Sequence, residues 1–173
     1  IATGSHVASL PGIEIDEKNI ISSTGALSLN KVPKKLAIIG AGYIGLEMGS
    51  VWSRLGSDVT VVEYLDYITP GMDREISKEF EKILTKQGIK FRLNSKVNSV
   101  KNEKNSVLIK FTDNKTLKQD SMLADKVLVS VGRKPYTEGL NLSKIGISKD
   151  DKGRIKVNKN LQKLVKNIYA IGD

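Results

Sequence analysis

Hydrophobic residues predict a strand, a helix and a second strand between residues 36 and 62. The continuous apolar run 36–39 is typical of a strand buried on both faces of a parallel sheet. From residue 43 to 55, apolar side chains recur at positions 44, 48, 51 and 55 and therefore share one stripe of a helix. Gly56 ends this helix, and the β-branched run 59–62 follows. This order predicts a parallel strand-helix-strand crossover.

A second helix and several strands are predicted further along the chain. Asp73 can cap a helix whose apolar positions 76, 80, 83 and 84 share a face, and Gly88 marks its end. Beyond it the period changes toward 2. The predicted strands are residues 89–93, 97–101, 107–112, 127–131 and 168–171, with a hairpin turn at Asp113 and Asn114. The pattern predicts an α/β fold, a Rossmann-like, doubly wound parallel sheet with a β-meander or hairpin crossover.

Residues 1–35 lack this periodicity. Pro11 and Gly12 indicate a turn, and Pro33 breaks any helix that leads into the first predicted strand. We therefore expect an irregular or extended linker there. The length of 173 residues fits one ordinary domain with a sizeable core, and no apolar run reaches 18 residues, so we expect no membrane span.

The composition excludes several kinds of chemistry. Without cysteine, the chain has no disulfide, thiol nucleophile, dithiol redox centre or cysteine-ligated metal. Its one histidine, His6, cannot build a histidine-rich metal site and lies in a Gly-Ser-rich stretch without a partner cluster. We therefore predict no metal site and no catalytic residue within this chain.

Positive charge is concentrated in the second half. Residues 1–89 hold 9 basic and 11 acidic side chains, whereas residues 90–173 hold 19 basic and 8 acidic ones. A basic half could attract nucleic acid, but few basic residues are adjacent and aromatic residues make up only 5% of the chain. A solvated lysine-rich face explains the charge, and we expect no nucleic-acid partner.

Residues 40–45, Gly-Ala-Gly-Tyr-Ile-Gly, match the pattern G-x-G-x-x-G. The match follows a predicted buried strand and opens a predicted helix, which is the context of a dinucleotide-binding turn. Gly40 permits the tight turn, Gly42 lets the backbone approach a diphosphate, and Gly45 allows close packing of helix and strand. The free N–H groups and positive dipole end of the helix then suit an anion.

Glu63 ends the second predicted strand, eighteen residues after Gly45, close to the spacing expected for an acid that binds the adenosine ribose. Its carboxylate would accept hydrogen bonds from both ribose hydroxyls and repel a 2′-phosphate. The next residues, Tyr64, Leu65 and Asp66, supply no cation to neutralise such a phosphate. The sequence therefore favours NAD over NADP.

With these residues in place, the chain resembles the flavoprotein pyridine nucleotide-disulfide oxidoreductases. Residues 36–63 resemble the central nicotinamide-binding domain of that family, and three further stretches, 2–5, 130–135 and 169–173, resemble its exit from the flavin domain, its V-G-R-x-P stretch and its return into the flavin domain. The resemblance implies flavin-domain stubs and linker at 1–35, an NAD-binding domain at 36–150 and a return segment at 151–173.

The resemblance also implies cofactor contacts. The diphosphate would lie on the turn around Gly42, the adenine beside Val97, the nicotinamide near Gly132, and FAD of the full-length protein against Gly4 and Asp173. Tyr43 and Glu47 resemble residues at the junction of nicotinamide and flavin. The implied cofactor-binding residues are Gly4, Gly40, Ala41, Gly42, Tyr43, Ile44, Gly45, Glu47, Glu63, Val97, Ser130, Val131, Gly132, Arg133 and Asp173.

The resemblance is strongest to family members that reoxidise dihydrolipoyl groups of 2-oxoacid dehydrogenase complexes and pass hydride to NAD. It implies lipoyl domains as partners of a homodimeric parent enzyme in the bacterial cytoplasm or the mitochondrial matrix, and inactivity of this chain alone. Alternatives are another disulfide reductase or NADH oxidase of the family, or a non-catalytic NAD-sensing module. Glu47 could also simply form a surface pair with Arg54.

Overall fold

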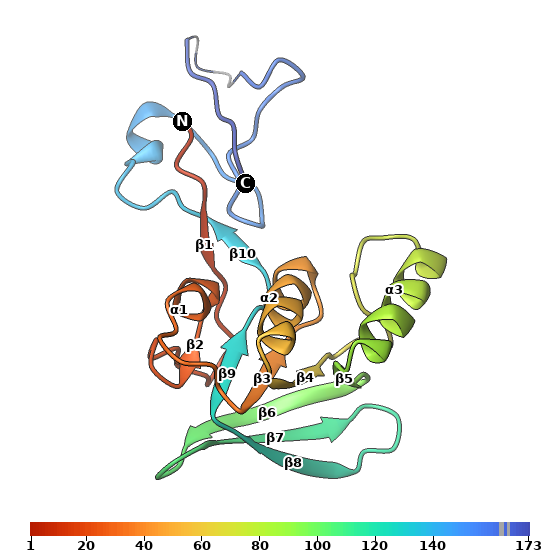
Figure 1. Ribbon diagram of the computed structural model, residues 1–173. Coiled ribbons are helices and arrows are strands. Elements are labelled where there is room, and N and C mark those ends of the chain that lie inside the picture. Colours follow the sequence, from red (N-terminus) through yellow and green to blue (C-terminus); the bar gives the residue numbers. More distant parts are fainter. Residues whose placement is uncertain (163–164, 166) are drawn as a thin grey trace. The chain divides into compact units, whose positions relative to one another are not determined.

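The computed structural model describes residues 1–162, 165 and 167–173 of the chain, which form two compact units (Figure 1). The larger unit is Ser9–Gly132, and the smaller unit combines Ile1–Ala8 with Arg133–Asp173. The boundaries therefore differ from those expected at residues 35 and 150. None of the helices in the described part of the chain has the length and apolar character needed to cross a bilayer.

A five-stranded parallel sheet forms the centre of the larger unit. Its strands, in spatial order, are β2 (Ile20–Ile21), β9 (Lys126–Val129), β3 (Lys35–Ile39), β4 (Asp58–Val62) and β5 (Lys90–Arg92). The predicted crossover is confirmed, because β3 and β4 pair in parallel and α2 (Tyr43–Arg54) connects them.

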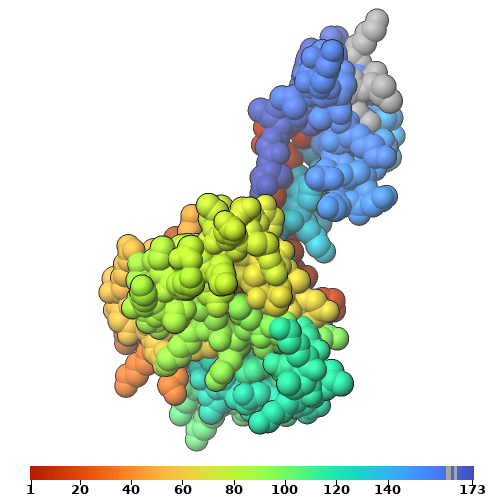
Figure 2. All heavy atoms as spheres, turned by 90° about the vertical axis from the view of Figure 1, so that its right-hand side faces the viewer, coloured from red at the N-terminus to blue at the C-terminus, as the bar shows by residue number. Residues whose placement is uncertain are grey.

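Helices cover one face of this sheet and an antiparallel meander covers the other. Side chains alternate along a strand, so Ile38 and Leu128 pack with α1 (Ser23–Leu27), α2 and α3 (Arg74–Lys86), whereas Ala37 and Val129 face the meander. The meander consists of β6 (Ser95–Asn102), β7 (Val107–Asp113) and β8 (Gln119–Ala124). It confirms the predicted meander after the second helix. Figure 2 views the molecule from the side of α3.

The buried face of α2 is not the predicted stripe. Val51 and Leu55 are about half exposed, whereas Gly45, Leu46, Gly49 and Trp52 are buried. A Cβ at Gly49 would approach Cδ1 of Ile38 to 2.9 Å, so the two glycines allow the helix to lie very close to the sheet. Close approach at small residues, rather than the arrangement of large apolar ones, sets the orientation of this helix.

The start of α3 agrees with its predicted cap. The side chain of Asp73 accepts hydrogen bonds from the N–H groups of Glu75 and Ile76. Its apolar face is only partly buried, however: Leu84 is 2% exposed, whereas Ile76, Phe80 and Ile83 are substantially exposed.

Residues 9–35 are part of the larger unit, not a linker. Strand β2 pairs with β9, and helix α1 follows with Ser22 as its N-cap. Asp16 fastens this segment, because its carboxylate accepts hydrogen bonds from the N–H groups of Lys18, Asn19 and Ile20 and from the side chain of Asn102 on β6. Short, irregular elements like these carry no periodic signal.

Asp16 is expected to make this attachment sensitive to acid. Burial raises the pKa of Asp16, but the hydrogen bonds from Asn102 and from the backbone lower it to about 2, against the usual 3.8. The ionised form is therefore favoured in the folded state, and its stabilisation is complete above pH 4 and lost as pH falls through 2. Urea unfolding should show Asp16→Asn less stable than the parent at pH 7, with the difference shrinking between pH 4 and 2. A difference independent of pH would contradict this assignment.

The smaller unit contains few regular elements. β1 (Ser5–Val7) pairs antiparallel with β10 (Arg133–Pro135), and a single 3-10 turn, η1 (Leu142–Ile145), follows. The strand predicted at residues 168–171 is wrong, because an isolated bridge between Gln162 and Tyr169 is the only strand pairing in that stretch among the described residues.

Candidate functional site

The carboxyl ends of β3, β4 and β9 meet at one edge of the parallel sheet, where residues 40–45 turn into α2. We call residues 40–45 the glycine turn. The N–H of Gly40 donates to the carbonyl of Val62 (2.9 Å), and the N–H of Ser130 donates to the carbonyl of Ile39 (2.9 Å). The turn is therefore held between the two neighbouring strands.

Gly40 and Gly45 are glycines for internal reasons. Gly40 has φ +101°, and a Cβ there would lie 2.5 Å from the carbonyl oxygen of Ser130. A Cβ at Gly45 would contact the carbonyl oxygen of Gly40 and lie 2.6 Å from Oγ of Ser130. These contacts support the predicted tight turn at Gly40 and the predicted close packing at Gly45.

Gly42 differs from both, since nothing inside the chain requires a glycine there. Its φ is −73°, and a Cβ would have no protein atom within 4 Å. Gly42 is the N-cap of α2 and offers no side chain to the first-turn N–H groups, which in any helix lack partners within the helix. The open space and these N–H groups together form a place where an anion can approach the backbone.

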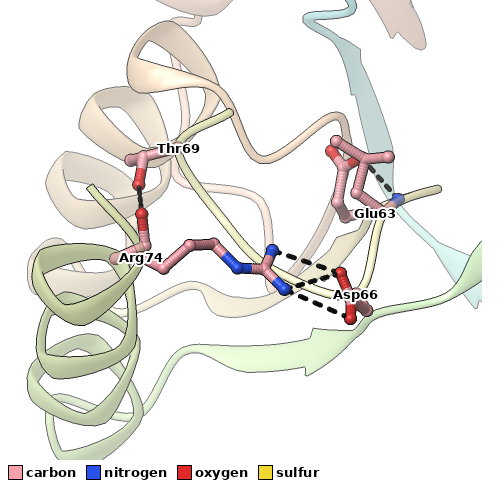
Figure 3. A network of polar contacts seen from close by, with 6 residues as sticks. Glu63, Asp66, Thr69 and Arg74 are labelled. Atoms are coloured by element: carbon pink, nitrogen blue, oxygen red, sulfur yellow. Dashed lines mark hydrogen bonds and ion pairs between the residues drawn. The ribbon is translucent and has the colours of Figure 1, made fainter. Parts of the chain in front are cut away.

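Glu63 lies against the glycine turn, as Figure 3 shows, and is only 8% exposed. Its Oε2 accepts a hydrogen bond from the N–H of Ala41 (2.7 Å), and its Oε1 accepts one from the N–H of Leu65 (2.9 Å). A carboxylate offers about four acceptor positions, so two remain for a ligand. The predicted acid is therefore at the turn, where it also fixes the conformation of Ala41.

Thr69 holds the same turn from the other side. Its N–H donates to the carbonyl of Ala41 (2.8 Å), and its hydroxyl is hydrogen-bonded to the hydroxyl of Ser77 on α3 (2.8 Å; Figure 3). Thr69 is 4% exposed and has φ +50°, a strained conformation for a β-branched residue. Both polar groups of Ala41 are thus bound by residues that follow β4.

Two asparagines hold the segment just after Glu63. The side chain of Asn114, in the β7–β8 turn, donates to the carbonyl of Tyr64 (2.8 Å), and the N–H of Asn94 donates to the carbonyl of Leu65 (2.8 Å). Neither these two residues nor Thr69 belongs to the predicted set of site residues. For Asn94 and Thr69 the only signal was their position, because the chain segments that follow β5 and β4 leave the parallel sheet at the same end. Asn114 lies in the antiparallel meander, and no signal in the sequence places it here.

The larger unit brings other predicted residues to this edge. The hydroxyl of Ser130 donates to the carbonyl oxygens of Ile39 (3.1 Å) and Gly40 (3.2 Å), so it helps to hold the start of the glycine turn. Val97 packs against the core on the meander side, two residues beyond Ser95, whose N–H donates to the carbonyl of Glu63 (2.8 Å).

The remaining predicted residues of the larger unit are Tyr43, Ile44, Glu47, Val131 and Gly132. Tyr43 is 64% exposed at the start of α2, and Glu47 is also exposed. The ion pairs among the described residues do not include Glu47 with Arg54, so the alternative surface pair is not formed.

Gly4, Arg133 and Asp173 come together in the smaller unit. Arg133 donates to the hydroxyl and the carbonyl of Ser5 (both 2.6 Å), and Ser5 donates to the carboxylate of Asp173 (2.8 Å). Gly4 and Asp173 also line a cavity of about 330 Å³. The boundary between the two compact units falls between Gly132 and Arg133.

The family model described as pyridine nucleotide-disulphide oxidoreductase matches residues 1–173. The chain is 56% identical over 173 residues to the mitochondrial dihydrolipoyl dehydrogenase of Pisum sativum, covering 100% of this chain and 34% of that protein. It is 56% identical over 173 residues to a leghemoglobin reductase of Glycine max (33% of that protein) and 53% identical over 174 residues to the mitochondrial dihydrolipoyl dehydrogenase of Caenorhabditis elegans (35%), with 100% of this chain covered in both. The chain thus spans about a third of these relatives.

The chain also resembles two solved structures over almost its whole length. The HOCl-induced flavoprotein disulfide reductase RclA of Escherichia coli matches with a TM-score of 0.87 and 32% identity over 99% of this chain and 38% of that one. LpdA of Mycobacterium tuberculosis matches with a TM-score of 0.89 and 28% identity over 99% of this chain and 36% of that one.

Proposed function

Because the chain belongs to the pyridine nucleotide-disulphide oxidoreductase family, we propose that its larger unit is the NAD(H)-binding domain of a dihydrolipoyl dehydrogenase. The observation that carries this proposal is the contrast among the three glycines. Two of them are needed by the fold, whereas Gly42 faces open space beside free N–H groups and the carboxylate of Glu63. An approach of a ligand to the backbone explains a glycine at this position.

The residues of the larger unit fit a dinucleotide. The N–H groups at the start of α2 would bind the diphosphate, and the free acceptor positions of Glu63 would bind the two hydroxyls of the adenosine ribose. Val97 would contact the adenine, and Ser130, Val131 and Gly132 would lie toward the nicotinamide. In this role the chain positions the nicotinamide, and the bound cofactors supply the hydride chemistry.

The chain supplies only part of the parent enzyme. It contains no cysteine, so the redox dithiol would have to come from outside these 173 residues. Gly4 and Asp173 would contact FAD, and the remaining flavin contacts would also have to come from elsewhere. We accordingly propose that this chain alone does not turn over, and that the parent passes electrons from dihydrolipoyl groups through a dithiol and FAD to NAD.

The proposed partners and location follow from the relatives. The name dihydrolipoyl dehydrogenase supports dihydrolipoyl groups as the substrate of the parent. We also propose that the parent is a homodimer that serves the lipoyl domains of 2-oxoacid dehydrogenase complexes. The dihydrolipoyl dehydrogenases of Pisum sativum, Arabidopsis thaliana and Caenorhabditis elegans are named as mitochondrial, which supports the mitochondrial matrix if the source is eukaryotic.

A second candidate function is that the chain is the NAD-binding domain of a different member of the family, with the same nucleotide contacts. The matches to a leghemoglobin reductase and to the disulfide reductase RclA favour this alternative. The sequence that flanks the chain in its parent decides between them, through the spacing of the cysteines that form the redox dithiol.

Titration of the chain with NADH and with NADPH, followed by calorimetry, tests the proposed function. We expect saturable binding of NADH and at least tenfold weaker binding of NADPH. The absence of NADH binding by the folded chain would refute the proposal, and equal binding of both nucleotides would refute its NAD specificity.

Gly42→Val provides a matched test of the glycine contrast. Because a Cβ at Gly42 meets no protein atom and the φ of −73° suits any residue, the variant should remain folded and lose only about 1 kcal/mol, since valine is a poorer N-cap than glycine. It should nevertheless lose NADH binding, since the side chain occupies the space that the diphosphate needs. A variant that binds NADH like the parent would show that the dinucleotide does not approach this backbone.

A further inference from the structure

Arg74 brings a cation to the region of the ribose-binding acid. It is the first residue of α3, eleven positions after Glu63, so the residues directly after Glu63 give no sign of it. Its guanidinium nitrogens lie 3.3–3.4 Å from the carboxylate oxygens of Asp66, and its Cζ lies 3.8 Å from the centre of the Tyr67 ring. Figure 3 shows the side chain extending from α3 toward Asp66.

The position of Asp66 relative to Glu63 is fixed by the backbone. Asp66 is three positions after Glu63, so the Cα atoms of the two acids lie at most about 11 Å apart. The N–H of Leu65 donates to Glu63, and the carbonyl of Leu65 accepts from the N–H of Asn94, which together hold the intervening chain around the carboxylate. The Asp66–Arg74 pair is therefore attached to the chain within about 11 Å of the residue proposed to bind the ribose, and the inference below places a ribose 2′-phosphate against this pair.

We propose that Asp66 is a second specificity-determining residue, which excludes a ribose 2′-phosphate by engaging the guanidinium of Arg74. This inference rests on the proposed function, because it assumes that Glu63 binds the adenosine ribose. The chain then selects NAD(H) with two carboxylates, of which one binds the hydroxyls and the other neutralises the arginine that could bind a phosphate.

The charges around Asp66 support this role. The hydrogen bond from Arg74 lowers the pKa of Asp66, with a smaller contribution from the charge of Lys115, so Asp66 is ionised at neutral pH. A 2′-phosphate would meet this negative charge as well as that of Glu63. Arginine binds phosphate well because its planar guanidinium forms two parallel hydrogen bonds, and Asp66 occupies that donor pair.

The Asp66–Arg74 ion pair is also weak enough to be broken without a large loss of stability. Both side chains are exposed, Arg74 to 58% and Asp66 to 48%, and contacts of 3.3–3.4 Å are longer than ordinary charge-assisted hydrogen bonds. Exposed ion pairs of this kind contribute little to stability. Loss of the Asp66 carboxylate should therefore free Arg74 without unfolding the chain. In this proposal, discrimination against NADPH depends on the repulsion between that carboxylate and the 2′-phosphate.

The test compares NADH and NADPH affinities of the parent chain, Asp66→Asn and the double variant Asp66→Asn/Arg74→Gln by calorimetry at low and high salt. Asp66→Asn should bind NADPH at least tenfold more tightly than the parent and NADH within threefold of the parent. The double variant should lose the gain, and the gain should shrink with salt. Asp58→Asn, which breaks the similarly exposed pair of Asp58 with Lys90 at the opposite end of β4, should change neither affinity.

Three results would overturn the inference. If the parent binds NADH and Asp66→Asn gains no NADPH affinity, the inference fails while the proposed function stands. If the gain persists in the double variant, Arg74 is not the phosphate ligand. If the folded parent binds neither nucleotide, the proposed function fails and the inference with it. Urea midpoints of all variants confirm that each is folded.

Discussion

Replacing Gly40 by alanine is expected to lower the free energy of unfolding of the larger unit by about 2–6 kcal/mol, in which backbone strain and overpacking contribute about 1–3 kcal/mol each. The φ of +101° is a conformation that residues with a Cβ rarely adopt. The new Cβ would also lie 2.5 Å from the carbonyl oxygen of Ser130, a backbone atom held by the sheet. Urea unfolding followed by circular dichroism measures the loss.

Gly56→Ala is the matched control for this prediction. Gly56 has φ +106°, almost the value of Gly40, but a Cβ there would have no neighbour within 4 Å. The control should therefore show only the strain contribution, about 1–3 kcal/mol. Equal losses for the two variants would contradict the close approach of Gly40 to β9.

Glu63→Ala is expected to weaken NADH binding at least a hundredfold, or about 3 kcal/mol or more, because it would remove the two charge-assisted hydrogen bonds that we propose to the ribose hydroxyls. The same change leaves the N–H of Ala41 without its partner at 2.7 Å, which should lower the stability by about 1–3 kcal/mol. Calorimetric titration measures the first effect and urea unfolding the second.

Glu63→Gln separates the two roles of this side chain. The amide has nearly the same shape but no charge, and its one oxygen can accept from the N–H of either Ala41 or Leu65. Its NH2 group then faces the other N–H, so a smaller loss of stability than in Glu63→Ala is expected. Its NADH affinity should fall between those of the parent and Glu63→Ala, and its discrimination against NADPH should decrease. Unchanged NADH affinity in Glu63→Ala would show that the carboxylate only supports the turn.

The sequence predicts most of the regular elements because each has a local signal. The apolar runs of β3 and β4, the cap of α3 at Asp73 and the change of period after residue 88 all agree with the structure. The orientation of α2 could not be predicted from its large apolar residues. Glycines at 45 and 49 have no hydrophobicity to contribute to a periodic pattern, yet their small size determines which face approaches the sheet.

The composition of the candidate site is predictable only in part. The sequence pattern contains Gly40, Gly42, Gly45 and Glu63. All four belong to one strand-helix-strand crossover, so their spacing along the chain is characteristic and can be recognised. Thr69 reaches the same site from a loop, through a backbone conformation that its residue type disfavours, so no sequence rule indicates it. Contacts between separate loops depend on where the strands end in space.

The most direct test of the central claim is the change in the backbone amide resonances of the 15N-labelled chain as NADH is added. We predict the largest shifts at the N–H groups of residues 42–45, with further shifts at residues 63–66. The far end of the sheet, around Lys35 and Asp58, should stay unchanged. Saturable binding that shifts those distant residues and leaves residues 42–45 unaffected would contradict a diphosphate site at the start of α2.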